Sequence, residues 1–252
     1  APGLADALST CTPAVLPCNF VLTALVSGLA IAVIHPEVDK LRWSMLTIND
    51  LAVGLFAVNG TSKALDLGTS GMTAVFMGMF TALGGGTLRD MLIGYFPPRM
   101  FTNFHYVLLA CLCAIIVFAI ARTFKERYVA RERMIEQINN VFDAIGLGVF
   151  AVSGARIGME AGFADNMFLT TFLGTTTAIG GGMIRDVLLR EMPFVLKKRV
   201  YAVAAILGAL GYALLLRVGL GEVAAYGLGM LITTAVRMLA TVFKWNLPKA
   251  LE

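Results

Sequence analysis

The stretch Thr81-Ala82-Leu83-Gly84-Gly85-Gly86-Thr87-Leu88-Arg89-Asp90 returns in the second half of the chain as Thr177-Ala178-Ile179-Gly180-Gly181-Gly182-Met183-Ile184-Arg185-Asp186. Seven of the ten positions are identical. A second matching pair precedes them in the same order, Phe56-Ala57-Val58-Asn59-Gly60 and Phe150-Ala151-Val152-Ser153-Gly154. Two motifs that recur in the same order indicate an internal duplication, and this duplication decides the expected fold.

The composition places both copies in a membrane. Hydrophobic residues make up 58% of the 252 residues and charged residues only 14%. A soluble domain could not hide so much apolar side chain, which excludes an ordinary soluble enzyme, a disordered chain and a disulfide-stapled secreted module. The apolar runs exceed the length of barrel strands, so we predict an all-α polytopic membrane protein. The formal net charge of +4 is assigned to the flanks of membrane spans, and no nucleic-acid partner is expected.

We predict seven transmembrane helices, arranged as two inverted three-helix repeats plus a seventh helix. The expected spans are 49–67, 71–95, 105–121, 141–161, 167–189, 200–216 and 223–243. The expected divisions are an N-terminal extension over 1–48, repeat 1 over 49–121, a basic cytoplasmic connector over 122–140, repeat 2 over 141–216, and the seventh helix with the C-terminal tail over 217–252. Because each repeat has an odd number of spans, the second copy enters the membrane from the opposite side.

The N-terminal extension contains an uncharged apolar run over residues 20–34. It is short for a span, and we expect an extra membrane helix or an interfacial segment over about 18–35. A signal-peptide core is the alternative, although no basic residue precedes the run. The loops that hold most of the lysine and arginine residues are expected on the cytoplasmic side, which also places the C-terminus in the cytoplasm.

The three consecutive glycines in the middle of two spans are unfavourable for helix formation, at about 1 kcal/mol each relative to alanine. We expect both helices to break there, at Gly84–Gly86 and Gly180–Gly182, with exposed backbone groups that line a wet cavity. The alternative is close helix packing, since small residues let backbones approach.

An arginine and an aspartate follow each glycine triplet inside the span, where charges are costly and usually paired. Adjacent helical residues do not face each other, so each arginine is expected to pair outside its own dipeptide. The expected partners are Asp186 or Asp143 for Arg89, and Asp90 or Asp50 for Arg185. These charges form either a clasp between the repeats or a charged wall of a conduction path, and both interpretations stay open.

The paired motifs resemble those of the prokaryotic trimeric intracellular cation (TRIC) channels, a family also labelled with a glycine transporter domain name. The resemblance covers about 49–248, including Trp245-Asn246-Leu247-Pro248. It implies a three-plus-three inverted repeat plus one helix, a homotrimer with one pore per protomer, and potassium-preferring permeation of monovalent cations. Asn49 departs from the family, whose members usually have aspartate there.

We therefore expect a potassium-preferring channel in the bacterial inner membrane, with monovalent cations, membrane lipid and further copies of the chain as its partners. A secondary carrier for a small solute such as glycine is the alternative, and a purely structural membrane protein is a third reading. We identify no catalytic set, metal cluster or cofactor motif, so neither an enzyme nor a cofactor is expected. The candidate ion-pathway residues are Thr81, Gly84, Gly85, Gly86, Arg89, Asp90, Asp143, Thr177, Gly180, Gly181, Gly182, Arg185, Asp186 and Lys63, the last also expected to snorkel to the cytoplasmic interface.

A basic cluster, Lys197-Lys198-Arg199, follows Pro193 on the expected cytoplasmic side. Basic residues close to a leaflet attract anionic lipid at about 1 kcal/mol each. The cluster is therefore a candidate headgroup site. The alternative is that these charges only fix the orientation of the protein in the membrane.

Overall fold

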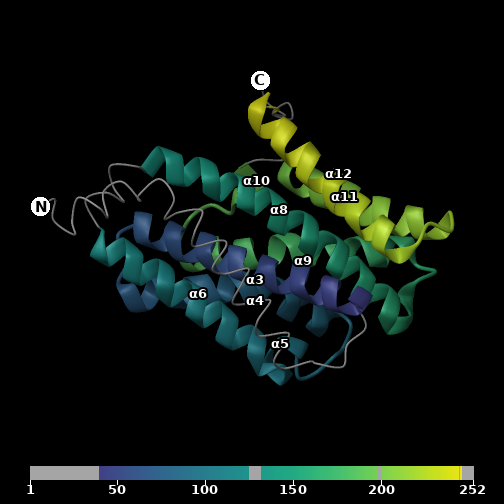
Figure 1. Cartoon of the computed structure of the whole chain (residues 1–252), viewed down its shortest axis with the longest axis horizontal. Helices are drawn as coiled ribbons and strands as arrows, with labels where there is room; N and C mark the ends of the chain where they lie inside the picture. Colours follow the sequence, from purple (N-terminus) through teal and green to yellow (C-terminus); the bar gives the residue numbers. More distant parts are fainter. Residues whose placement is uncertain (1–39, 125–131, 198–199, 244, 246–252) are drawn as a thin grey trace, which may run out of the picture.

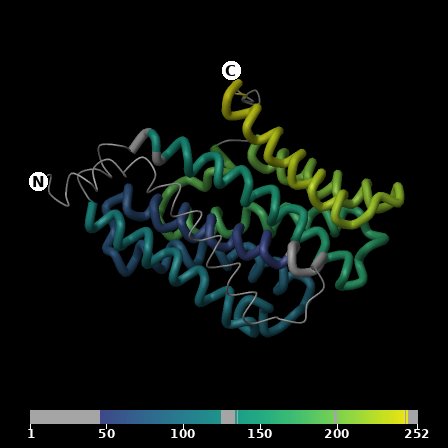
Figure 2. The backbone as a smooth tube through the Cα atoms, in the orientation of Figure 1, coloured from purple at the N-terminus to yellow at the C-terminus, as the bar shows by residue number. Residues whose placement is uncertain are grey.

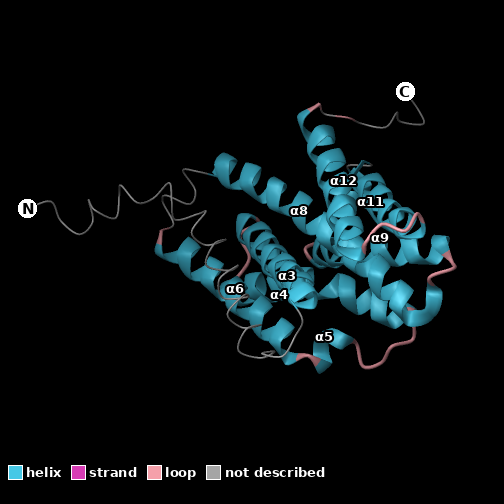
Figure 3. Ribbon diagram, turned by 45° about the vertical axis from the view of Figure 1, so that its right-hand side comes forward, coloured by secondary structure: helices cyan, strands magenta, loops and turns pink. Residues whose placement is uncertain are grey.

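The computed structural model describes residues 40–124, 132–197, 200–243 and 245, and every regular element in these ranges is helical (Figures 1 and 3). The extra membrane segment expected over 18–35 lies outside the described residues. The helices are α3 (Lys40–Asp66), α4 (Gly71–Leu92), α5 (Arg99–Thr102), α6 (Phe104–Thr123), α8 (Glu132–Gly158), the π-helical η1 (Met159–Phe163), α9 (Met167–Leu188), α10 (Phe194–Lys197), α11 (Val200–Arg217) and α12 (Glu222–Val242).

The two repeats use the same packing scheme. In repeat 1, α3 packs against α4 and α6; in repeat 2, α8 packs against α9 and α11 in the same way. The short helices α5 and α10 occupy equivalent places before the third long helix of each repeat. Helix α12 covers α8 and α11, and Figure 2 shows it at the edge of the bundle, away from repeat 1.

The second helix of each repeat begins at the same kind of cap. The Ser70 hydroxyl accepts a hydrogen bond from the Thr73 amide at 3.2 Å, and the Asn166 side chain accepts one from the Leu169 amide at 3.0 Å. Serine and asparagine are preferred here because their side chains satisfy an amide that has no partner within the helix. The duplication therefore repeats the local start signal as well as the apolar pattern.

Helices α4 and α9 cross at the glycine triplets, and the expectation that these helices break there is wrong. Helix α4 is continuous over Gly71–Leu92 and α9 over Met167–Leu188. A Cβ added at Gly85 would overlap the carbonyl oxygen of Thr177, and one at Gly181 would overlap that of Thr81. The glycines let the two backbones touch, which is the packing alternative, and the contact offsets their low helix propensity.

Six helices of the described residues are long and apolar enough to cross a membrane: α4, α6, most of α8 with η1, α9, α11 and α12. Helix α3, with 27 residues, is not among these six, and it packs against α4, α6 and α8. Both first helices of the repeats extend beyond membrane length. Helix α8 begins at Glu132, inside the segment expected as a connector, so part of that segment is helical.

Candidate ion pathway

The two Arg-Asp dipeptides adopt one geometry. The Arg89 Nε donates to Asp90 Oδ1 at 2.9 Å, and the other carboxylate oxygen, Oδ2, accepts from the Arg99 amide at 2.8 Å. In repeat 2 the Arg185 Nε donates to Asp186 Oδ1 at 2.9 Å, and Asp186 Oδ2 accepts from the Phe194 amide at 2.8 Å. Each aspartate therefore ties its arginine to the start of the following short helix.

The expected pairing of each arginine outside its own dipeptide is wrong for both motifs. Adjacent Cβ atoms do point in different directions, but the long arginine side chain folds along the helix until its guanidinium reaches the neighbouring carboxylate. Both aspartates are fully buried at 0% exposure, where an unpaired carboxylate would be strongly unfavourable. In each motif the Nε and Nη2 of the arginine contact the same carboxylate oxygen, Oδ1, and provide that partner.

Two polar contacts join α3 of repeat 1 to α9 of repeat 2. Lys63 Nζ of α3 lies 2.6 Å from Asp186 Oδ1, so this lysine is ion-paired across the repeats rather than merely snorkelling. Arg185 Nη1 also donates to Asn59 Oδ1 at 2.8 Å. Asp186 thus holds one cation from each repeat.

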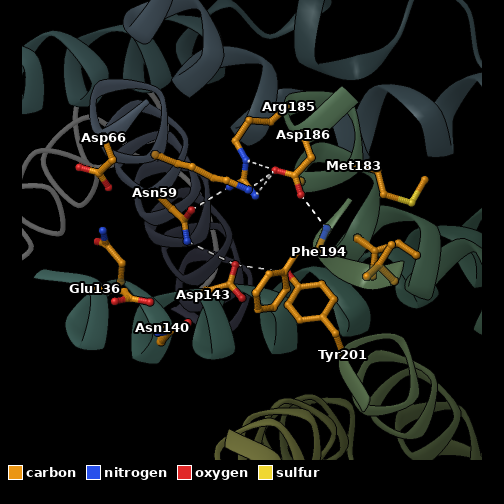
Figure 4. Close-up of a pocket in the computed structure, with 15 residues that line it drawn as sticks. Asn59, Asp66, Glu136, Asn140, Asp143, Met183, Arg185, Asp186, Phe194 and Tyr201 are labelled. Carbon is orange, nitrogen blue, oxygen red and sulfur yellow. Dashed lines mark hydrogen bonds and ion pairs between the residues drawn. The ribbon is translucent and has the colours of Figure 1, made fainter. Parts of the chain in front are cut away.

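These side chains line a cavity of about 260 Å³ between α3, α8, α9 and α11, which we call the acidic vestibule (Figure 4). Four carboxylates face it and only two cations. Figure 4 shows Asn59, Arg185 and Asp186 pointing into one space, with Asp143 of α8 opposite them. The charged lining residues are Lys63, Asp66, Glu136, Asp143, Arg185 and Asp186.

Asp143 is held in the acidic vestibule by two donors. Asn59 Nδ2 lies 3.4 Å and the Tyr201 hydroxyl 3.2 Å from Asp143 Oδ1. Behind the Tyr201 ring lies Arg237 of α12, whose guanidinium carbon is 5.1 Å from the ring centroid and 5.2 Å from that of Phe194. Two cation–π contacts therefore fix the wall of the vestibule to the seventh helix.

A second cavity of about 250 Å³ lies at the pseudosymmetric position and has the opposite charge. We call it the basic vestibule. Its charged lining residues are Arg89, Arg99, Arg156 and Glu160. Here Ser153 donates to Asn49 Oδ1 at 3.2 Å, the counterpart of the Asn59–Asp143 contact. Asn49 thus occupies the place that Asp143 has in the acidic vestibule.

The region between the vestibules is closed in this conformation. Among the described residues, no residue lines both cavities. The rings of Phe56 and Phe150 meet in the middle at 4.9 Å between centroids, and both residues are buried. The Thr81 and Thr177 hydroxyls are turned to carbonyl oxygens of their own helices, Met77 at 2.6 Å and Leu173 at 2.7 Å.

The structure distributes the candidate ion-pathway residues over three places. Lys63, Asp143, Gly182, Arg185 and Asp186 line the acidic vestibule. Arg89 lines the basic vestibule, and Asp90 is buried in contact with the Arg89 side chain. Those at the central crossing of α4 and α9 are Thr81, Thr177, Gly84, Gly85, Gly180 and Gly181, while Gly86 faces the Met100 side chain.

In the basic cluster, Lys197 pairs with Glu191 at 2.9 Å, and Lys198 and Arg199 lie outside the described residues. Sequence reasoning passed over Tyr201 and Glu136, which line the acidic vestibule, and Arg237, which lies behind the Tyr201 ring. The signal for Arg237 was present, because an ionisable residue in the middle of a span is a functional candidate by default.

The comparison with known proteins follows the same division into two repeats. The family model described as Glycine transporter matches residues 46–122 and again 140–217, once in each repeat. The chain belongs to this family. A UPF0126 membrane protein of Vibrio cholerae is 32% identical over 221 residues, covering 86% of this chain and 88% of the relative. The UPF0126 inner membrane protein YadS of Escherichia coli K12 is 29% identical over 198 residues, covering 78% and 90%.

Solved structures of TRIC cation channels share the fold. One, from work on the structural basis of conductance, is 33% identical and superposes with a TM-score of 0.71 over 80% of this chain and 95% of that one. The TRIC orthologue of Rhodobacter sphaeroides is 28% identical, with a TM-score of 0.71 over 80% and 99%. The predicted family and the predicted all-helical, inverted-repeat membrane fold are thereby confirmed.

Proposed function

We propose that this chain is a monovalent cation channel that prefers potassium, with one pore in each protomer of a homotrimer. The observation that carries the proposal is the acidic vestibule, where four carboxylates outnumber two cations inside a walled cavity. A cleft lined by one sign of charge raises the local concentration of the opposite ion. The likeness to TRIC cation channels at 33% identity supports the same function.

The pore of this proposal joins the acidic vestibule to the basic vestibule through the α4–α9 crossing. Opening requires the Phe56–Phe150 contact to part and the Thr81 and Thr177 hydroxyls to leave their own helices. Hydroxyl and backbone oxygens would then replace part of the hydration shell of a passing cation. We expect modest discrimination between potassium and sodium, because hydroxyls on two helices do not form a rigid ring of carbonyls.

The proposed orientation places the acidic vestibule toward the cytoplasm of a bacterium and the basic vestibule toward the outside, in the inner membrane with the C-terminus inside. The excess of lysine and arginine on the Lys63 side supports this orientation. An inner membrane location is also what the name of the Escherichia coli relative states for that protein.

A carrier for a small solute such as glycine is the second candidate. Two vestibules separated by a closed centre are also what alternating access requires of a carrier, and the description of the family model names a glycine transporter. A zwitterion would find carboxylates and guanidinium groups in the acidic vestibule.

Recording from the purified protein in planar bilayers, run beside glycine uptake into proteoliposomes, separates the two functions. The channel predicts unitary currents far above the turnover of a carrier, and glycine uptake no faster than into empty liposomes. Saturable, electrically silent glycine uptake without unitary currents would reject the channel.

A further inference from the structure

Asp50 is a carboxylate that neither vestibule uses. It follows Asn49, and since successive helical residues are about 100° apart, it points to α6 while Asn49 lines the basic vestibule. Asp50 is 1% exposed, and neither of its carboxylate oxygens accepts a hydrogen bond from any described residue. A buried carboxylate in this state is strongly unfavourable unless something neutralises it.

The imidazole of His105, at the start of α6, is a group able to neutralise Asp50. His105 Nε2 lies 3.9 Å from Asp50 Oδ1. This distance is too long for a hydrogen bond but short enough for strong attraction between a carboxylate and an imidazolium. The His105 side chain is 19% exposed, so protons can reach the pair.

The pair belongs to repeat 1 alone. The residue equivalent to Asp50 in repeat 2 is Ala144, and the residue equivalent to His105 is Val200. The symmetric packing of the two repeats therefore forms without such a pair in repeat 2. A purely structural requirement of the fold does not explain it.

Other charges at this end of the molecule are already engaged. From α4, Arg89 and Asp90 hold each other; from α8, Arg156 pairs with Glu160 and Glu222. From α5, Arg99 lies over the Tyr95 ring. Besides His105, α6 contributes Tyr106, whose ring contacts the imidazole in a tilted arrangement, with 3.9 Å between centroids and 41° between the ring planes.

Tyr106 connects the pair to the proposed ion path, because it also lines the basic vestibule. A change in the position of His105 is passed to Tyr106 through the contact between the two rings and through the shared start of α6. Protonation of the pair can therefore alter the wall of the vestibule without any charge entering it.

We propose that Asp50 and His105 form a proton-binding pair that couples the pH at the basic vestibule to the packing of α6 against α3. With one proton bound, the pair is neutral overall and holds α6 in the described position. When the proton leaves, Asp50 remains as an uncompensated buried anion, which favours hydration of the α3–α6 contact and a shift of Tyr106. The effect of the pair on currents rests on the proposed channel function, whereas proton binding itself does not.

The pair is tested first by histidine NMR on the protein of 252 residues, in whose sequence the two histidines are His35 and His105. His105→Asn assigns the signal. The Asp50→Asn variant is expected to lower the midpoint of the His105 titration by about one pH unit, because the neighbouring charge that favours imidazolium is gone. Asp165→Asn, which removes an exposed carboxylate from a turn, is expected to leave the midpoint unchanged. An unchanged midpoint in Asp50→Asn overturns the pair.

The second measurement is the open probability in bilayers as the pH on the side of the basic vestibule falls from about 8 to about 6, the range in which histidine titrates. The wild-type protein is expected to lose most of its open probability, and Asp50→Asn and His105→Asn to lose that pH dependence. If both variants keep the wild-type pH dependence, the coupling is refuted. A wild-type protein that carries no current at any pH refutes the channel, and the NMR midpoint then decides the proton pair by itself.

Discussion

Asp143 is the residue at which the charge of the acidic vestibule is most directly tested. It accepts hydrogen bonds from Asn59 and Tyr201 and faces the cavity from α8. Replacing Asp143 with Asn keeps the size of the side chain and removes one negative charge. We expect potassium conductance to fall about twofold at low ionic strength and to approach that of the wild type at high salt, where the Debye length is short.

The comparison variant is Asp165→Asn, which removes an exposed charge from a residue that lines neither vestibule. Single-channel recording at two salt concentrations is the measurement. Equal conductance of Asp143→Asn and wild type at low salt would show that the acidic vestibule does not concentrate cations.

At the residue scale the sequence selected several side chains that the structure brings together, but it did not predict how they pair. Lys63, Asp143, Arg185 and Asp186 were each expected on the ion pathway, and they line one cavity. The pairing of each arginine with its neighbour was missed because Cβ directions do not determine where a long side chain ends. Tyr201 and Glu136 were missed because an aromatic or acidic residue near a span end gives no sign of which way the helix turns it.

The close packing of α4 against α9 at their crossing keeps the region between the two vestibules closed. A methyl group at position 85 would collide with the Thr177 carbonyl, which is backbone and cannot rotate away. We therefore expect Gly85→Ala to destabilise the protein by about 1–3 kcal/mol, the usual cost of overpacking. Thermal unfolding in detergent is the measurement.

Gly227→Ala is the matched control, because Gly227 lies in helix α12 with open space where the methyl group would go. Its melting temperature should equal or slightly exceed that of the wild type. If Gly85→Ala and Gly227→Ala have the same melting temperature, the glycine triplets are not required for close packing of α4 against α9. The sequence was compatible with a broken helix and with close helix packing at these triplets. The backbone geometry of the structure decides between the two, because both helices are continuous.

The basic cluster 197–199, which begins at the last residue of α10, is proposed to bind anionic lipid. Lys197 lowers the pKa of Glu191 by hydrogen bonding and charge, so its own charge is partly compensated. Neutralising Lys197, Lys198 and Arg199 together should reduce retention of anionic lipid during purification and change open probability. Glu191→Gln, which frees Lys197, should increase retention.

Lipid mass spectrometry of the purified variants measures the effect. If the triple variant retains its lipid and its gating, the cluster only sets orientation in the membrane. Both outcomes require that the variant keeps its topology, which cysteine labelling of the C-terminal tail checks.

For the whole molecule, the duplication determined more of the fold than any single element did. The apolar runs predicted seven spans, two motifs that recur in order predicted their division into two repeats, and the odd number of spans in each repeat predicted the inverted relation. The asymmetry between an acidic and a basic vestibule does not follow from them, because it arises from substitutions such as Asn49 for Asp143 and Ile157 for Lys63 at equivalent positions.

The assembly is expected to be a homotrimer. The structure describes one chain, and the support is the likeness to trimeric cation channels. Chemical crosslinking in mild detergent should give monomer, dimer and trimer bands and nothing larger. A ladder that stops at dimer, together with a dimer mass by light scattering, would contradict the trimer.

The central claim is that the pore passes cations, and the reversal potential of single-channel currents under a KCl gradient tests it most directly. The purified wild-type protein, in a bilayer with more KCl on one side, should give unitary currents that reverse close to the potassium equilibrium potential. When NaCl replaces KCl, the currents should reverse close to the sodium equilibrium potential, and the conductance should be smaller. Reversal at zero or toward the chloride equilibrium potential would contradict the account.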